Sequence, residues 1–254
     1  MTRLVLVGLM WSLAPNVAWA HEAWLVAGDG GVSLATGEDF TGEPRPLRRE
    51  RTASLRRYVG ADAGEVAWPM DAGALAAVPV GSAGLISWDS QPSLIELSGD
   101  EFTAYLREDG LAEALADRAD AGQSKLPGRE RYRRCLKVLL QPGAFAVKTG
   151  QALELVPQSE PLTPALDAVR PFVLLLQGKP LSGARVRAWS WRGPNLVTIS
   201  GRTGTDGVAR FELPHAGRWM ISTVHMMRLT AVKEADWESF WASLTFDVPA
   251  RVSP

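Results

Sequence analysis

The residue best suited to bind a metal is His21, because it follows a segment typical of a cleavable export signal. Arg3 precedes an apolar run over residues 4–13, and a small-x-small cleavage site ends at Ala20. Cleavage there leaves a free α-amine and an imidazole on one residue, and these two nitrogens can chelate a transition metal together. The sequence therefore predicts a signal peptide over residues 1–20 and a metal ligand at the mature N-terminus.

A second histidine would complete the three-nitrogen set known as a histidine brace, and His215 and His225 are the two that remain. His225 lies in an expected strand over residues 218–230, which holds a ligand rigidly. Met227 falls on the same face of that strand and offers a soft thioether. His215 falls in a predicted turn, so we prefer His225. The expected metal ligands are His21, His225 and Met227, and nickel, cobalt and copper all remain open as the metal.

Each of these side chains also has a purely structural interpretation. A strand histidine such as His225 often bonds a carbonyl, and Met227 could simply pack in the core. The single cysteine, Cys135, is expected to be a buried apolar residue, because no zinc-type spacing surrounds it. Three carboxylates are expected to be solvated charges rather than ligands: Glu22, Asp236 and Glu238.

The N-terminal region, residues 21–157, contains short apolar runs that Gly and Pro interrupt, which is typical of β-structure. A helical excursion is expected over about residues 98–134. It begins with a capping-box pattern, in which Ser98 is followed three residues later by Glu101. Residues 129–140 are expected to begin as a charged helix and to end as a strand.

The C-terminal region, residues 168–254, repeats strand and turn at the intervals of a β-sandwich. Asp206-Gly207 marks a tight turn between two of its strands. The expected fold class is mainly β, with an N-terminal β-rich domain that carries a helical insertion. An immunoglobulin- or transthyretin-like β-sandwich follows it.

The amino-acid composition limits the kinds of partner that the protein can bind. The formal net charge of −1 argues against nucleic acid, which would require a concentrated basic face. The apolar run of the signal is shorter than a membrane-spanning helix, and no later run is long enough. One cysteine makes no internal disulfide. These features predict a periplasmic protein with no membrane span after signal removal.

Several short motifs, in the order in which they occur, give the chain a family resemblance. The most specific are His21-Glu22-Ala23-Trp24-Leu25, Gly178-Lys179-Pro180-Leu181, Thr205-Asp206-Gly207 and Asp236-Trp237-Glu238. With them the chain resembles a family of exported bacterial proteins classed as a domain of unknown function and associated with nickel and cobalt uptake (NikM-like). The resemblance implies a metal-linked role outside the cytoplasm, with a membrane transporter or outer-membrane receptor as a possible partner.

Three functions follow as alternatives. The first is a non-catalytic binder of nickel, cobalt or copper that supports metal uptake. The second is a copper-dependent oxidative enzyme built on the same histidine brace. We expect no tyrosine beside such a site, since the chain has only Tyr58, Tyr105 and Tyr132. The third is a metal-free adhesion or assembly module, because a sandwich fold does not determine function. No Ser-His-Asp pattern or phosphate-binding glycine loop is present, which argues against a hydrolase or a nucleotide-binding enzyme, and the non-catalytic binder is the function we expect.

Overall fold

The computed structural model describes residues 22–250, apart from residues 29, 69, 72, 76 and 165–167. The predicted signal peptide and His21 lie outside the described residues. No helix of the described part has the length and apolar character needed to cross a membrane.

A nine-stranded sheet runs through the whole molecule, in the order β14-β13-β16-β17-β9-β7-β4-β5, with β8 also paired to β9. The pairing of β17 with β9 is parallel and the other pairings are antiparallel. Its strands are β4 Thr52–Val59, β5 Asp62–Glu65, β7 Leu85–Ser90, β8 Ser93–Leu97, β9 Gly128–Leu139, β13 Arg185–Arg192, β14 Asn195–Arg202, β16 Gly217–Arg228 and β17 Trp237–Val248.

Three smaller sheets surround it. A four-stranded sheet contains β10 Leu153–Pro157, β11 Val169–Leu176, β12 Lys179–Pro180 and β15 Val208–Glu212. An antiparallel hairpin is formed by β1 Glu22–Gly28 and β2 Gly31–Gly37. The short strands β3 Leu47–Arg48 and β6 Ala74–Leu75 pair with each other, and β3 leads into the 3₁₀ turn η1 Arg49–Arg51.

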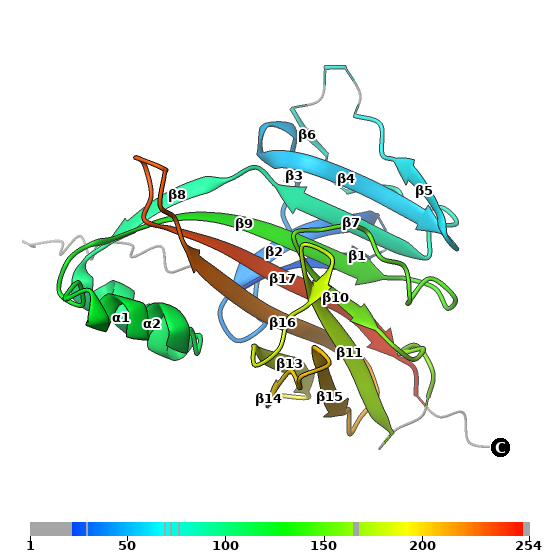
Figure 1. Ribbon diagram of the computed structural model, residues 1–254. Helices are drawn as coiled ribbons and strands as arrows, with labels where there is room; N and C mark the ends of the chain where they lie inside the picture. The colour runs from blue at the N-terminus through cyan, green and yellow to red at the C-terminus, as the bar shows by residue number, and fades with distance from the viewer. Residues whose placement is uncertain are drawn as a thin grey trace, which may run out of the picture.

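The nine-stranded sheet is covered on both faces (Figure 1). On one face it packs against the four-stranded sheet, in an apolar core that includes Phe172, Phe211, Trp219 and Phe246. The β1–β2 hairpin and the two helices cover the other face. Residues of β16 alternate between these layers, because successive side chains of a strand point to opposite sides. The predicted C-terminal sandwich is confirmed in this sense.

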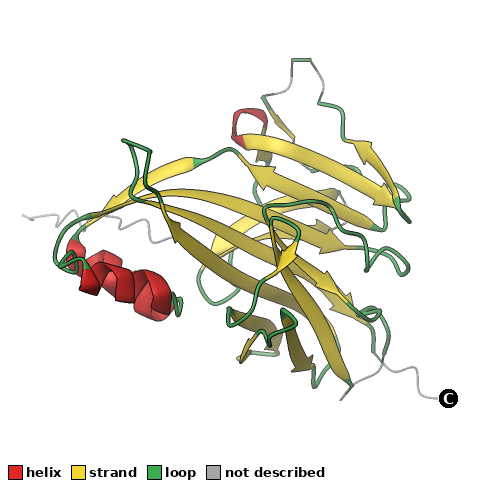
Figure 2. Ribbon diagram, viewed as in Figure 1, coloured by secondary structure: helices red, strands yellow, loops and turns green. Residues whose placement is uncertain are grey.

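The expected helical excursion is confirmed by α1 Gly99–Glu108 and α2 Ala112–Asp120, which lie together at one end of the molecule (Figure 2). Ser98 caps α1 as the sequence predicts: its hydroxyl accepts from the Glu101 amide, and the Glu101 carboxylate accepts from the Ser98 amide. The excursion is shorter than expected, because β9 begins at Gly128.

The charged helix expected at the start of residues 129–140 is wrong, since strand β9 already begins at Gly128 and continues to Leu139. Its charges instead join neighbouring strands. Arg129 forms an ion pair with Asp236 at 2.7 Å, and Arg131 forms one with Glu238 at 2.9 Å on the adjacent β17. A run of charges is compatible with a strand when the neighbouring strand supplies the opposite charges.

The long strand expected over residues 218–230 is confirmed by β16, and Asp206-Gly207 turns the chain into β15, with Gly207 at φ +74°. Only glycine adopts such a conformation without strain. Strands from both predicted domains pair in the nine-stranded sheet, since β9 lies directly beside β17. The domain boundaries remain a prediction.

A buried ion pair joins the two sheets. Lys137 of β9 and Glu154 of β10 lie 3.0 Å apart, and each side chain is only 2% exposed. The Glu154 carboxylate also accepts from the amides of Thr149 and Gly150. Burial lowers the pKa of Lys137, and the charge of Glu154 opposes that effect.

We predict that Lys137→Met destabilises the fold by about 3–5 kcal/mol, because it leaves a buried carboxylate without its cation. The double variant Lys137→Met/Glu154→Gln should recover part of this loss, since no unpaired charge then remains. Urea unfolding measures both. The same substitution in the exposed Lys125–Asp100 pair, Lys125→Met, is the control and should change stability little. A double variant no more stable than Lys137→Met contradicts the prediction.

Candidate functional site

A hollow of about 350 Å³ lies where the β1–β2 hairpin, β13 and the end of α1 meet. We call it the acidic hollow, because five carboxylates and one guanidinium line it. Its ten lining residues are Glu22, Gly37, Glu38, Asp39, Tyr105, Glu108, Asp109, Arg187, Trp189 and Trp241. The described chain therefore begins, at Glu22, inside this hollow.

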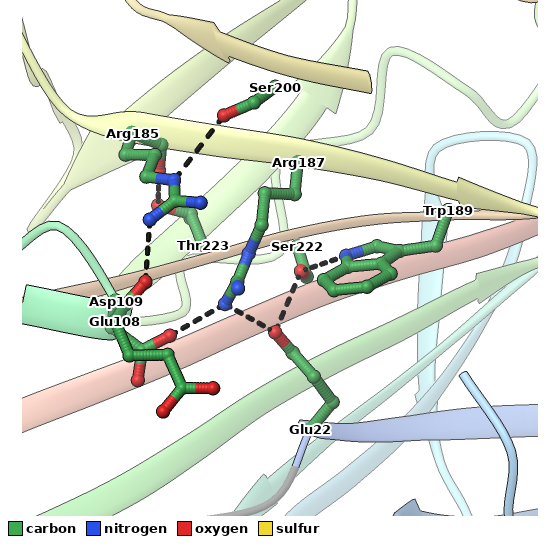
Figure 3. Close-up of polar contacts among 9 residues, drawn as sticks. All are labelled: Glu22, Glu108, Asp109, Arg185, Arg187, Trp189, Ser200, Ser222 and Thr223. Carbon is green, nitrogen blue, oxygen red and sulfur yellow. Dashed lines mark hydrogen bonds and ion pairs between the residues drawn. The ribbon is translucent and has the colours of Figure 1, made fainter. Parts of the chain in front are cut away.

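Arg187 organises the polar side of the hollow (Figure 3). Its Nη2 atom donates to Oε1 of Glu22 at 2.8 Å and to Oδ1 of Asp109 at 2.6 Å. All three side chains are 13% exposed or less. The guanidinium also lies over the Trp189 ring, 4.9 Å from its centroid. One arginine thus joins the first residue of β1 to the C-cap residue of α1.

Hydroxyl and backbone groups complete this network. Ser222 of β16 donates to Glu22 at 3.2 Å and accepts from the Trp189 indole at 2.9 Å. Arg185, two residues before Arg187, donates to the carbonyl of Glu108 and thereby holds the end of α1 against β13. The positions of Glu22 and Asp109 are therefore set by several elements at once (Figure 3).

Two largely buried carboxylates share one guanidinium, and burial raises the pKa of both. Burial raises the pKa of Glu22 above its ordinary value, against the lowering effect of Arg187. Burial likewise raises the pKa of Asp109 to about 7, which Arg187 opposes and the charge of Glu22 reinforces. Such groups hold a proton to a higher pH than exposed carboxylates do.

Aromatic rings form the other wall. Tyr105 stacks on Trp241 with ring centroids 6.0 Å apart, and its hydroxyl donates to the buried carboxylate of Glu130 at 3.1 Å. Trp241 donates to Ser239, which in turn hydrogen-bonds Glu130. Tyr105 thus lines the same hollow as Glu22, whereas the expectation of no tyrosine beside a site at His21 stays a prediction.

Two of the predicted ligands, His225 and Met227, do not line this hollow. His225 lines a different hollow of about 170 Å³, beside the start of α2. It lies three residues beyond Ser222, so alternation puts the two side chains on opposite faces of β16. Met227 packs against the core of the two sheets. Burial lowers the pKa of His225, and Glu113 opposes that effect.

The remaining candidates have structural partners. His215 packs on Trp219 with ring centroids 4.7 Å apart, and its Nδ1 lies 2.8 Å from the Ala216 carbonyl oxygen. Cys135 is buried as predicted, and burial raises the pKa of its thiol to about 12. Glu22, expected to be solvated, has a side chain that is only 12% exposed. No group of three or more His, Cys, Asp or Glu side chains among residues 22–250, outside the gaps, is arranged to hold a metal ion.

Sequence reasoning missed Arg187 and Asp109. The available signal for Arg187 is a charge between Val186 and Ala188 in an apolar strand, where a buried charge requires a partner. No comparable local signal marks Asp109, because its role depends on a strand 78 residues away.

Comparison with known proteins identifies the family of this chain. A family model described as "Domain of unknown function (DUF4198)" matches residues 18–227, which include the whole acidic hollow except Trp241. No curated protein matches the chain.

We predict that the stability of the protein falls as pH rises toward 7, and that Asp109→Asn weakens this dependence. The unfolded chain loses the Asp109 proton near about pH 4, whereas the folded state holds it to about 7. Between these values the folded state binds more protons, so stability drops by at most about 1.4 kcal/mol per pH unit for this group. Glu22 contributes with the same sign. The charges of Arg187, Arg185, Arg134 and Glu108 also act on one or both carboxyls of the pair.

Urea unfolding across about pH 4.5 to pH 7.5 measures the slope for both proteins. Asp117→Asn, on the exposed face of α2, is the matched control and should keep the wild-type slope. An unchanged slope in Asp109→Asn would show that Asp109 ionises normally in the folded state.

Proposed function

Since this chain belongs to the DUF4198 family, whose function is unknown, we propose a function from its own geometry. The protein is an exported, non-catalytic binder of a divalent transition metal ion, nickel, cobalt or copper, that supports metal uptake. Its ligands include the α-amine and imidazole of His21, which signal-peptide cleavage releases. One observation carries the proposal: the residue after His21 lines a hollow in which five carboxylates face one guanidinium.

Covalent geometry supports this position for the metal. Consecutive Cα atoms are about 3.8 Å apart, so cleavage after Ala20 creates the new amine within one residue of Glu22. Glu22 itself is held in place by Arg187, Ser222 and the backbone pairing of β1 with β2. Because Glu22 is fixed, a chelating His21 attached to it would have few positions available.

Electrostatics supports a cation as the ligand. The carboxylates of Glu38 and Asp39 enter the hollow from the end of β2, and those of Glu108 and Asp109 enter from α1. A cleft lined by one sign of charge concentrates counter-ions. Nitrogen and carboxylate oxygen are donors that borderline divalent ions accept. The described residues alone do not form a metal cluster, and His21 supplies the two nitrogens that complete one.

The pairing of His21 with His225 and Met227 is the competing ligand set within the same proposal. Its weakness is the position of His225, on the face of β16 opposite Ser222. In its favour, the His225 imidazole is half-buried, and burial favours the neutral ring, which is the form that binds a metal. A transporter or outer-membrane receptor of the periplasm is the proposed recipient of the metal.

We predict that protein cleaved after Ala20 binds Ni(II) and Cu(II) at least about tenfold more tightly than protein with a Gly-Ser extension before His21, a difference of about 1.4 kcal/mol. The extension converts the amine into an amide and removes one ligand. His21→Ala should lose as much. Competition titration against a chelator gives the affinities, and mass spectrometry verifies the processed terminus.

His215→Ala is the control, since His215 packs on Trp219 outside the acidic hollow. His225→Ala separates the two ligand sets: full affinity excludes His225, and a loss equal to that of His21→Ala places it in the site. Equal metal affinities of the processed and extended proteins would contradict the proposal.

Tyr105 favours a second candidate, a copper-dependent oxidative enzyme. Its ring lines the hollow and stacks on Trp241, as expected of a group beside reactive copper. In that case copper-loaded protein should catalyse the two-electron reduction of O₂ to H₂O₂ by ascorbate faster than free copper does. Tyr105→Phe should change the rate without changing the Cu(II) affinity. Suppression of peroxide below the level of free copper would favour the binder.

A further inference from the structure

We propose that another hollow, which aromatic rings line, binds a proline-rich segment of a partner protein. This hollow has a volume of about 340 Å³ and lies between the β1–β2 hairpin and the end of β13. We call it the aromatic groove, and its walls include Trp24, Phe40, Gly42, Pro44, Trp191 and Arg218. The acidic hollow has none of these residues in its lining, so the inference does not depend on the proposed function.

Three aromatic rings form the walls of the groove. Trp24 and Phe40 pack edge to face, with their ring centroids 5.0 Å apart. Trp191 follows Trp189 by two residues on β13, so alternation places both rings on the hairpin side of the sheet. Trp189 is buried under the hairpin, whereas Trp191 extends past it and remains 38% exposed. The groove therefore combines buried rings with one large ring that is open to a ligand.

Phe40 is held in a strained backbone conformation. It follows β2 in a turn with a φ of +55°, in the left-handed region that bulky side chains rarely adopt. Such strain is concentrated at the functional sites of proteins. In the same turn, a Cβ on Gly42 would lie 3.1 Å from the Trp24 ring and 2.6 Å from the Thr36 carbonyl oxygen. Glycine at this position therefore lets the turn approach Trp24 closely.

The indole N–H of Trp24 has no hydrogen-bond partner within the described part of the chain, although the side chain is only 3% exposed. It is not one of the fully enclosed unpaired groups, so it reaches the surface that Trp24 lines. Trp191 donates to the Phe40 carbonyl at 3.3 Å, which is longer than the usual distance of about 2.9–3.0 Å. Arg218 is already paired with Asp247. A largely buried indole N–H normally has a partner, and here a ligand can supply it.

The side chains of the groove offer hydrogen-bond donors and no acceptors. Tryptophan and arginine only donate, and among the described residues no Ser, Thr, Asn, Gln, Asp or Glu lines the groove. A sugar would leave its hydroxyl donors without acceptors on these side chains. A polyproline II segment, in contrast, exposes its carbonyl oxygens, and its prolines carry no N–H. Such segments dock in grooves lined by aromatic rings. The lining therefore matches a proline-rich peptide better than a carbohydrate.

The experiment titrates decaproline into the isotope-labelled full chain and follows the indole N–H signals by NMR. We expect saturable shifts of the Trp24 and Trp191 signals, while the Trp241 signal of the acidic hollow stays in place. Cellohexaose and a glycine-serine peptide are the comparison ligands, and neither should cause these shifts. Shifts with cellohexaose but not with decaproline would overturn the inference in favour of a carbohydrate site. The absence of shifts with decaproline and cellohexaose would overturn it outright.

Two variants of Trp191 test the contribution of the exposed ring. Trp191→Phe keeps an aromatic ring and removes one donor, so it should weaken decaproline binding about threefold to tenfold. Trp191→Ala removes the ring as well and should weaken binding by more than about tenfold. Leu94→Ala removes another exposed apolar side chain, 60% exposed and outside the groove, and should bind like the wild type. Wild-type affinity of Trp191→Ala would refute the assignment of the peptide to the aromatic groove.

Discussion

The arrangement of the acidic hollow depends on a single guanidinium held between two buried carboxylates. Arg187 joins Glu22, 165 residues away in the sequence, to Asp109, which is 78 residues away. Removing three charged groups from water is expensive, and their mutual attraction offsets this cost only when the geometry is good. The hairpin, β13 and α1 must therefore all be in place for the contact to be favourable. The contact of Arg187 with both carboxylates therefore forms only when the hairpin, β13 and α1 have assembled.

The nine-stranded sheet gives the molecule two chemically different sides. Toward the four-stranded sheet, β16 and β17 present large apolar residues, which form an ordinary sandwich core. Toward the hairpin and helices they present Ser222, Ser239 and Trp241, which bind or support the residues of the acidic hollow. The alternation of side chains along a strand is what allows the same two strands to build a stable core and a polar site.

The features predicted correctly from the sequence are those with local causes. Ser98 and Glu101 cap a helix because their spacing lets each satisfy the other's amide, and Asp206-Gly207 turns the chain because glycine tolerates a positive φ. Strand β9 was misjudged because its charges find their partners on β17, about a hundred residues later, which no local pattern records. The acidic hollow could not be predicted from the sequence for the same reason. Glu22, Asp109 and Arg187 are unremarkable singly, and only the fold brings them together.

The parallel contact between β9 and β17 also imposes an order of assembly. β17 is the last strand of the described chain, yet it lies near the middle of the large sheet, between β16 and β9. Strands synthesised much earlier thus lack a shared neighbour until residues 237–248 emerge. Such long-range closure slows folding. The nine-stranded sheet of this chain therefore closes only when its last strand pairs with β16 and β9.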